Sequence, residues 1–197
     1  MIYSVKGKYI HGEPGFAVIE CAGVGYRCQT TTATQRNIKL NEEVTLYTHL
    51  NVREDAMELF GFYSQAELQT FRTLIGVSGV GPKMALSILS ELSTEQVVMA
   101  ISASDVKSLT RASGVGPKLA QRIILELKDK LKAFGASDVS MSSGGSVIAD
   151  TGNISKAVAA LAVLGYSAAD VTPVLSQLSP ELSVEQLIAQ TLRRMGR

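Results

Sequence analysis

The sequence predicts a multidomain protein of the α+β class, and three observations support this prediction. The first 63 residues are rich in β-branched and aromatic side chains, which is typical of short strands. Residues 74–92 and 109–127 repeat one another and have helical spacing. A stretch rich in glycine and serine then precedes a final helical segment. We expect three domains, at residues 1–63, 64–134 and 153–197. A flexible linker at residues 135–152 is expected between the last two.

Five runs within the first domain have the composition of strands, and glycine-containing turns separate the early ones. The expected strands are Ile2–Ile10, Phe16–Cys21, Tyr26–Thr32, Val44–Asn51 and Glu58–Phe62. Thr34–Lys39 is expected to form a short helical insert between the third and fourth strands. Five short strands in about 60 residues predict a small β-barrel, such as an OB-fold.

Helical signals begin at Ser64, where Ser64-Gln65-Ala66-Glu67 has the pattern of a capping box. The region 64–134 carries nine Lys and Arg residues against six Asp and Glu residues, a net charge of +3. The two flanking regions each carry −1, so the middle domain is the candidate anion-binding surface. Three further helices are expected at the end of the chain, at Ile154–Leu164, Ala168–Leu178 and Val184–Met195, the last two capped by Ser167 and Ser183.

The internal repeat is the most specific signal in the chain. Segments 74–92 and 109–127 are identical at 11 of 19 positions with an offset of 35 residues, and both contain the hexapeptide Ser-Gly-Val-Gly-Pro-Lys. Each copy predicts a helix, a sharp Gly-Val-Gly turn and a second helix that begins with proline. We therefore predict two helix-hairpin-helix motifs in tandem.

The two turns are candidate phosphate-binding sites that recognise DNA by shape rather than by sequence. Glycine lets the backbone approach another molecule, and the free N–H groups of a helix start attract an anion, aided by the helix dipole. If an approximate two-fold axis relates the copies, they would contact both strands of one duplex across the minor groove. The candidate set of residues in the two turns comprises Gly79, Val80, Gly81, Lys83, Gly114, Val115, Gly116 and Lys118. The two valines of this set are interpreted as core anchors rather than ligand contacts.

Glu54 and Asp55 lie between two strand-like segments, where a solvated turn is the simplest interpretation. A metal-dependent nuclease is a weaker one, because His11 and His49 are the only histidines and lack ligand spacing. We therefore expect no metal, no other cofactor and no catalytic site. A general helix-hairpin-helix accessory protein of DNA repair stays open as an alternative, as does a purely structural assembly protein.

Neither a membrane span nor a secretory signal is expected. The longest clearly apolar run, Ala157–Leu164, has eight residues, whereas a membrane helix needs about 20. The first residues, MIYSVKGKYIHGEPG, lack the apolar core of a signal peptide. Cys21 and Cys28 fit free thiols in a reducing compartment, so a cytoplasmic protein is predicted.

The paired SGVGPK hairpins, at 78–83 and 113–118, resemble those of the RuvA family of Holliday-junction-recognition subunits. Three other places agree with this resemblance. The start, MIYSVKGKYI, and VIECAGVGYRC at 18–28 are similar to the family's barrel, and VREDAMELFGF at 52–62 resembles its most diagnostic segment. LAVLGYSAADV at 161–171 is similar to its C-terminal three-helix, UBA-like domain. The resemblance covers the whole chain except the linker.

The resemblance implies a homotetramer that binds four-way junction DNA independently of sequence, with one or two tetramers per junction. It implies that the C-terminal domain recruits and stimulates RuvB, an AAA+ ATPase motor for branch migration in recombination and in DNA repair, including the SOS response. The resolvase RuvC can share the complex. The chain itself would be a non-catalytic subunit of an ATP-dependent helicase complex. The family's acidic pin maps onto Glu54 and Asp55, and its phosphate contacts map onto the glycines and lysines of both hairpins.

Overall fold

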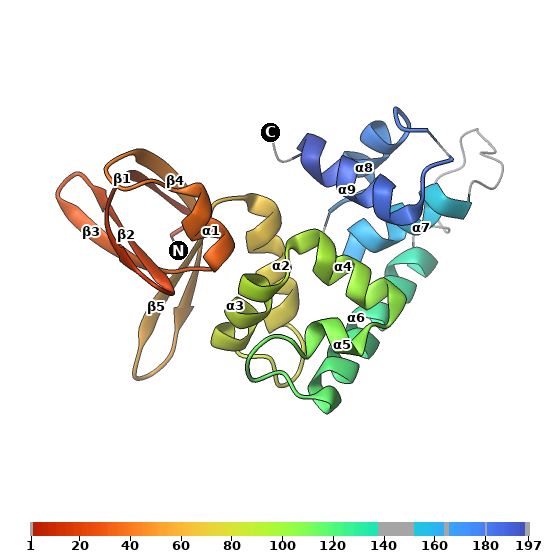
Figure 1. Ribbon diagram of the computed structural model, residues 1–197, viewed down its shortest axis with the longest axis horizontal. Helices are drawn as coiled ribbons and strands as arrows, with labels where there is room; N and C mark the ends of the chain where they lie inside the picture. The colour runs from red at the N-terminus through yellow and green to blue at the C-terminus, as the bar shows by residue number, and fades with distance from the viewer. Residues whose placement is uncertain (1, 138–151, 164–165, 180, 196–197) are drawn as a thin grey trace.

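The first part of the chain folds into a closed five-stranded barrel in the computed structural model, which describes residues 2–137, 152–163, 166–179 and 181–195. The strands are β1 (Ser4–Glu13), β2 (Phe16–Cys21), β3 (Val24–Gln29), β4 (Glu43–Val52) and β5 (Met57–Phe62). They close in the order β1-β2-β3-β5-β4, so the predicted OB-type barrel is confirmed (Figure 1). The pairing of β3 with β5 is parallel and the other pairings are antiparallel.

The barrel departs from the sequence prediction at several element ends; β3, for example, spans Val24–Gln29 rather than the predicted Tyr26–Thr32. Strand β1 continues to Glu13, past the predicted end at Ile10, because the turn that follows needs only Pro14 and Gly15. Gly15 has a φ of 95°, a conformation that glycine adopts without strain. The helical insert α1 (Thr32–Asn37) lies between β3 and β4 as expected, shifted by two residues.

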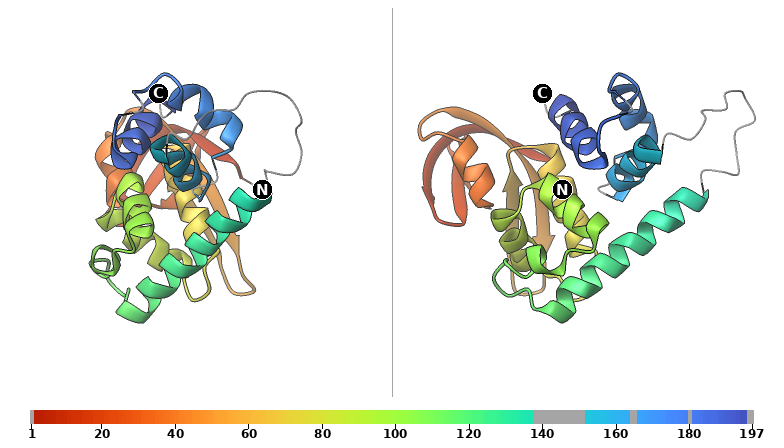
Figure 2. Two further views of the ribbon diagram at one scale, coloured as in Figure 1. Left: turned by 90° about the vertical axis from the view of Figure 1, so that its right-hand side faces the viewer. Right: turned by 45° about the vertical axis from the view of Figure 1, so that its right-hand side comes forward.

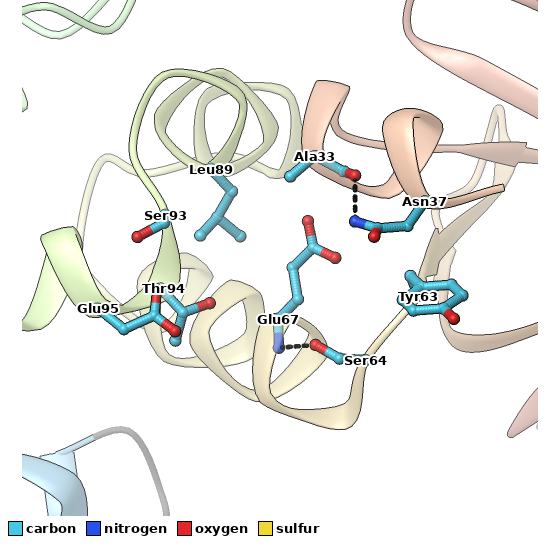
Figure 3. Close-up of a pocket in the computed structure, with 9 residues that line it drawn as sticks. All are labelled: Ala33, Asn37, Tyr63, Ser64, Glu67, Leu89, Ser93, Thr94 and Glu95. Carbon is cyan, nitrogen blue, oxygen red and sulfur yellow. Dashed lines mark hydrogen bonds between the residues drawn. The ribbon is translucent and has the colours of Figure 1, made fainter. Parts of the chain in front are cut away.

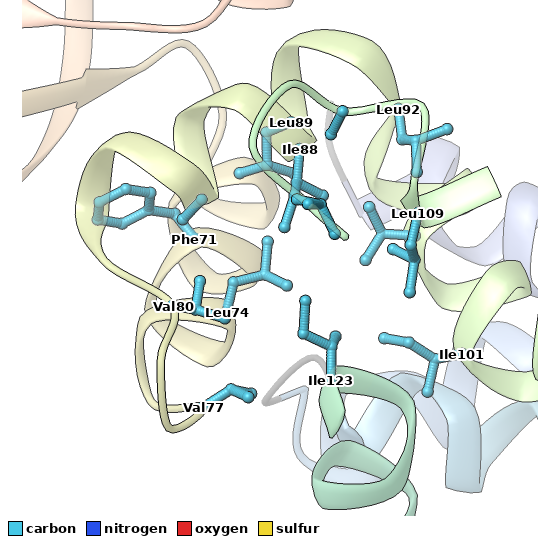
Figure 4. Packing of buried hydrophobic residues seen from close by; sticks show 14 of the residues in the cluster. Phe71, Leu74, Val77, Val80, Ile88, Leu89, Leu92, Ile101, Leu109 and Ile123 are labelled. Atoms are coloured by element: carbon cyan, nitrogen blue, oxygen red, sulfur yellow. The ribbon is translucent and has the colours of Figure 1, made fainter. Parts of the chain in front are cut away.

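The helices of the middle region pack around one large apolar cluster (Figure 4). They are α2 (Gln65–Ile75), α3 (Pro82–Glu91), α4 (Thr94–Ala103), α5 (Val106–Leu109) and α6 (Pro117–Ser137). Phe60 and Phe62 of β5 belong to the same cluster, so the barrel and the helices share buried surface. Helix α6 passes the predicted end at Phe134, and residues 138–151 of the predicted linker lie outside the described residues.

Helix α2 begins at Ser64 as predicted, but its capping box is only half formed. The Ser64 hydroxyl accepts a hydrogen bond from the Glu67 backbone N–H at 3.1 Å. The Glu67 carboxylate does not reach back to Ser64, because it is hydrogen-bonded to threonines of the α1 segment instead. A competing tertiary contact has therefore replaced half of a local motif.

Three helices complete the chain: α7 (Gly152–Val163), α8 (Ala168–Leu175) and α9 (Val184–Met195). Ser167 and Ser183 cap the last two as predicted, while Leu164, the predicted end of the first, lies outside the described residues. These helices lie together (Figure 2), and their buried side chains form a separate cluster with Val98 of α4. No single helix among the described residues is long and apolar enough to cross a membrane. Helices α3 and α4 reach that length and composition only together, and the chain bends by 96° between them.

Candidate DNA-binding hairpins

The first candidate hairpin connects α2 to α3 through a turn held by its own backbone. The Val77 N–H donates to the Leu74 carbonyl and the Val80 N–H donates to the Val77 carbonyl, both at 3.0 Å. Gly79 has a φ of 87°, and Gly81 is the N-cap of α3 with Pro82 as its first residue. The sequence therefore produces the predicted helix, turn and proline-initiated helix.

The second hairpin, between α5 and α6, reproduces this geometry 35 residues later. The Ala112 N–H donates to the Leu109 carbonyl at 3.3 Å and the Val115 N–H to the Ala112 carbonyl at 3.1 Å. Gly114 has a φ of 85°, and α6 begins at Pro117. Corresponding residues thus make corresponding hydrogen bonds, so the two copies have one local fold.

The two glycines of each turn have different roles. Gly79 and Gly114 occupy the left-handed region, where a Cβ would strain the backbone. Gly81 has a φ of −84°, which any residue adopts, and a Cβ built there meets no atom within 4 Å. Gly116 is equally open. The second glycine therefore leaves the outer surface of the turn clear rather than permitting the bend.

The turns present backbone N–H groups to the surface. All four glycines and both lysines of the set are exposed. In the part of the chain that the structure describes, the N–H groups of Gly79, Gly81 and Lys83 have no hydrogen-bond partner. The same holds there for the equivalent groups of the second hairpin, at Gly114, Gly116 and Lys118. Each turn can therefore donate several hydrogen bonds to one anion.

Val80 and Val115 hold the turns to the core. Each side chain is 5% exposed and belongs to the large apolar cluster, and each N–H donates inside its own turn. Neither valine therefore offers a side chain or an amide to a ligand, in line with their interpretation as anchors. Burial of one valine per turn fixes the loop against the helices and keeps its glycines at the surface.

Each hairpin is also held by the helix of the other motif. Arg122 on α6 donates to the Ser78 carbonyl at 3.5 Å, and Ser87 on α3 donates to the Ser113 carbonyl at 2.9 Å. These two contacts occupy equivalent positions of the repeat. The exchange is reciprocal, as an approximate two-fold axis between the motifs requires.

Two glutamates at equivalent positions of the repeat make a second set of contacts between the motifs. Glu126 on α6 accepts a hydrogen bond from the Ser78 N–H at 3.1 Å, and Glu91 on α3 forms an ion pair with Arg111 at 2.7 Å. Sequence reasoning did not identify these residues. The identity of Glu91 and Glu126 at equivalent repeat positions was the available signal.

Glu54 and Asp55 form the exposed tip of the turn between β4 and β5. The Arg53 N–H donates to the Ala56 carbonyl at 2.8 Å and closes this turn. The Arg53 side chain pairs with Glu58 rather than with either tip carboxylate. Among the described residues neither Glu54 nor Asp55 has an ion-pair partner, so their charges are directed to solvent.

The acidic turn and the two glycine turns extend to one side of the molecule. In Figure 1 the β4–β5 hairpin, the α2–α3 connection and the α5–α6 connection all reach the lower edge, and both views of Figure 2 agree. The last three helices lie at the upper side. The surface that presents free amides is thus remote from the C-terminal helices.

The described residues hold no metal-binding cluster, and one of the two cysteines is buried. Among them, no group of three or more His, Cys, Asp and Glu side chains is arranged to hold a metal ion. Cys28 is buried within the barrel, and this burial raises the pKa of its thiol to about 12, which keeps it protonated and unreactive. Both cysteines are free.

Comparison with known proteins gives matches along the chain. Residues 1–61 match the family model described as RuvA N terminal domain, residues 71–129 the SAM-like helix-hairpin-helix tandem, and residues 154–196 the RuvA C-terminal domain. The chain is similar to curated proteins named "Holliday junction branch migration complex subunit RuvA". That of Acetivibrio thermocellus is 42% identical, with 100% of both chains covered. That of Christiangramia forsetii is 39% identical, over 99% of this chain and 100% of the relative.

Proposed function

Because this chain belongs to the RuvA family, whose curated members are named as subunits of the Holliday junction branch migration complex, we propose that it binds four-way junction DNA by shape and recruits a motor. The observation that carries this proposal is the pair of equivalent glycine turns with exposed, unpartnered amides. Phosphate contacts of this kind position a protein on DNA but carry no base information. The activity is therefore structure-specific and independent of sequence.

Each hairpin binds the backbone of one strand in this proposal. The free N–H groups of the turn and the positive end of the following helix face a phosphate, and Lys83 or Lys118 adds a full positive charge beside it. The open space at Gly81 and Gly116 lets the sugar-phosphate backbone approach the turn. The reciprocal contacts between the motifs support two hairpins that engage the two strands of one duplex arm.

The acidic turn supplies selectivity when four subunits assemble around the junction. A homotetramer brings eight carboxylates, those of Glu54 and Asp55, towards the point where the strands exchange. Two unit charges 4 Å apart repel one another by about 1 kcal/mol in water and by several at a lower dielectric. The carboxylates therefore disfavour stacked or continuous duplex at the centre and favour an open junction.

The chain acts as a non-catalytic subunit in this proposal. The C-terminal helices, on the side remote from the hairpins, bind the RuvB AAA+ motor, which hydrolyses ATP and moves the DNA (Figure 1). One or two tetramers hold the junction, and a RuvC resolvase shares the complex. The protein works in recombination and DNA repair, in the cytoplasm.

The test compares the affinity of the full chain for a labelled four-way junction with that for a linear duplex of equal length. We expect a strong preference for the junction. The double variant Glu54→Gln/Asp55→Asn is expected to bind linear duplex more tightly and to lose about tenfold of that preference. The matched control is Glu42→Gln/Glu43→Gln, an adjacent exposed acidic pair at the opposite end of β4.

Equal affinities of the unmodified protein for junction and duplex would contradict the proposal and favour a general repair accessory protein. An unchanged preference in the Glu54/Asp55 variant would contradict the role of the acidic turn alone. Cleavage of the junction on addition of Mg²⁺ would instead indicate a nuclease.

A further inference from the structure

A buried carboxylate lies where the barrel meets the helices, away from the DNA-binding turns. Glu67 is 8% exposed, and burial raises the pKa of its carboxyl. A buried charge is costly unless hydrogen bonds or an opposite charge compensate it. Among the described residues Glu67 has no ion-pair partner, so hydrogen bonds alone stabilise it.

Those hydrogen bonds come from the barrel. The Thr31 hydroxyl donates to one carboxylate oxygen, and the Thr34 hydroxyl donates to the other at 2.6 Å. Both threonines are 0% exposed and belong to the start of α1. The carboxylate therefore links α2 to the α1 segment of the barrel.

The same threonines bind the backbone around them, which leaves the group little freedom. The Thr34 hydroxyl accepts from the Tyr63 N–H at 2.9 Å, and the Thr31 hydroxyl accepts from the Thr34 N–H at 3.0 Å. A further bond, from the Thr32 N–H to the Ser90 hydroxyl at 3.2 Å, joins α1 to α3. The network thus connects the barrel, the β5–α2 connection and two helices.

Packing beside Glu67 is incomplete. A pocket of about 150 Å³ lies between α1, α2, α3 and the start of α4, and Glu67, Leu89 and Glu95 are among its lining residues (Figure 3). One turn further along the same face of α2 the space is filled by rings, where Phe71 lies 4.8 Å from Phe62 and 5.2 Å from Phe60 between ring centroids. Apolar contact is non-directional, whereas a carboxylate that accepts two buried hydrogen bonds defines one orientation.

The orientation at this joint sets the geometry of the DNA-binding face. Only Tyr63 and Ser64 connect β5, a strand of the acidic hairpin, to α2, which leads into the first glycine turn. A rotation of α2 against the barrel would therefore move the turns relative to Glu54 and Asp55.

We propose that Glu67, held by Thr31 and Thr34, is a positioning residue that fixes the hairpin region relative to the barrel and so contributes to selectivity for four-way junctions. Its effect on orientation is independent of any ligand. Its effect on selectivity rests on the junction binding proposed above. In this proposal Glu67 lies away from the DNA-binding turns and makes no contact with DNA.

The experiment removes one buried hydroxyl in the full chain and compares it with a matched removal on the same joint. Thr34→Val deletes the donor to Glu67, whereas Thr70→Val deletes a hydroxyl that is 1% exposed but bonds only to the Ala66 carbonyl of its own helix. Thr34→Ser restores the donor and serves as the rescue. Circular dichroism and thermal unfolding report whether each variant is folded.

Two measurements are made on each variant. The first is the distance between spin labels on Glu13→Cys in the barrel and Gln121→Cys on α6, with Cys21→Ser in the background and labelled subunits diluted among unlabelled ones. We expect one narrow distance distribution for the unmodified protein, Thr70→Val and Thr34→Ser, and a broader or shifted one for Thr34→Val. The second is the affinity for junction and for duplex, whose ratio should fall about tenfold in Thr34→Val while duplex affinity stays unchanged.

The outcomes separate the two proposals. A distance distribution in folded Thr34→Val identical to that of Thr70→Val overturns the positioning role, whatever the DNA data show. A changed distribution with an unchanged affinity ratio overturns the contribution to selectivity. Absence of junction preference in the unmodified protein contradicts the proposed function, while the spin-label comparison still decides the orientation of the two parts.

Discussion

At the residue scale, the strongest candidates for contact with DNA phosphates are the lysines at the second position of each proline-initiated helix. Lys83 and Lys118 are exposed, follow the turns directly and form no ion pair within the described part of the chain. Arg111 also lies near a turn, but Glu91 compensates its charge. The free charges at the turns are therefore available to a phosphate without the loss of an existing partner.

We expect Lys83→Ala to reduce the salt dependence of junction binding. Eight hairpins in a tetramer, each neutralising about one phosphate, give a slope of log affinity against log salt of about −7, and loss of four lysines brings it to about −4. Affinity would fall for junctions of every sequence. Titrations between about 50 and 200 mM salt measure the slope. Lys39→Ala, an exposed lysine of the barrel, is the control, and an equal slope in both variants would exclude the hairpins as the electrostatic contact.

At the level of the structural element, different residues of each hairpin allow the backbone to bend and keep the surface of the turn accessible to a ligand. The first glycine supplies the left-handed conformation, the valine anchors the turn, and the second glycine keeps the outer surface clear. Only the accessibility of the turn concerns a ligand. One alanine substitution at each of the two glycines distinguishes bending of the backbone from accessibility.

We expect Gly79→Ala to lower the free energy of unfolding by about 1–2 kcal/mol, because alanine is strained at a φ of 87°. Gly81→Ala should leave stability nearly unchanged, since its backbone is ordinary and its Cβ meets no atom within 4 Å. It should instead weaken junction binding about tenfold by obstructing the approach of the backbone. Urea unfolding and gel-shift titration measure the two effects. Full affinity in Gly81→Ala would show that the strand does not approach this turn closely.

At the level of the whole molecule, the glycine turns and the C-terminal helices lie on different sides (Figure 2). The C-terminal helices pack on α4 through Val98, which is 2% exposed, and not on the glycine turns. In the proposed function, this arrangement lets one part of the chain bind the junction while another part binds the motor. The two activities should therefore be separable.

Deletion of residues 153–197 is expected to abolish stimulation of the RuvB ATPase on junction DNA while the junction affinity stays within about twofold. The deletion exposes Val98, so the truncated protein is also prepared with Val98→Thr to exclude aggregation as the cause. ATP hydrolysis and gel-shift assays give the two readouts. Loss of junction binding in both truncated proteins would contradict this division of labour.

The sequence by itself determined the five strands, the helical repeat and the chemistry of the turns. These features are local: β-branched alternation favours strands, and a Gly-Val-Gly-Pro segment allows few backbone conformations. It also identified the acidic pair, although its role came from the family resemblance. Ser167 and Ser183 were correctly predicted as caps for the same reason, because a cap depends on residues within one turn.

Only the tertiary structure decided how these parts are held together. The reciprocal contacts of Ser87 and Arg122 join residues that lie 26 and 44 positions from their partners, and no local pattern specifies such pairs. Glu67 shows the same limit, since its sequence position predicts a capping box and its environment makes it a link to the barrel. Local propensity selects the elements, whereas the burial of shared surface selects which side chains from distant segments must compensate one another.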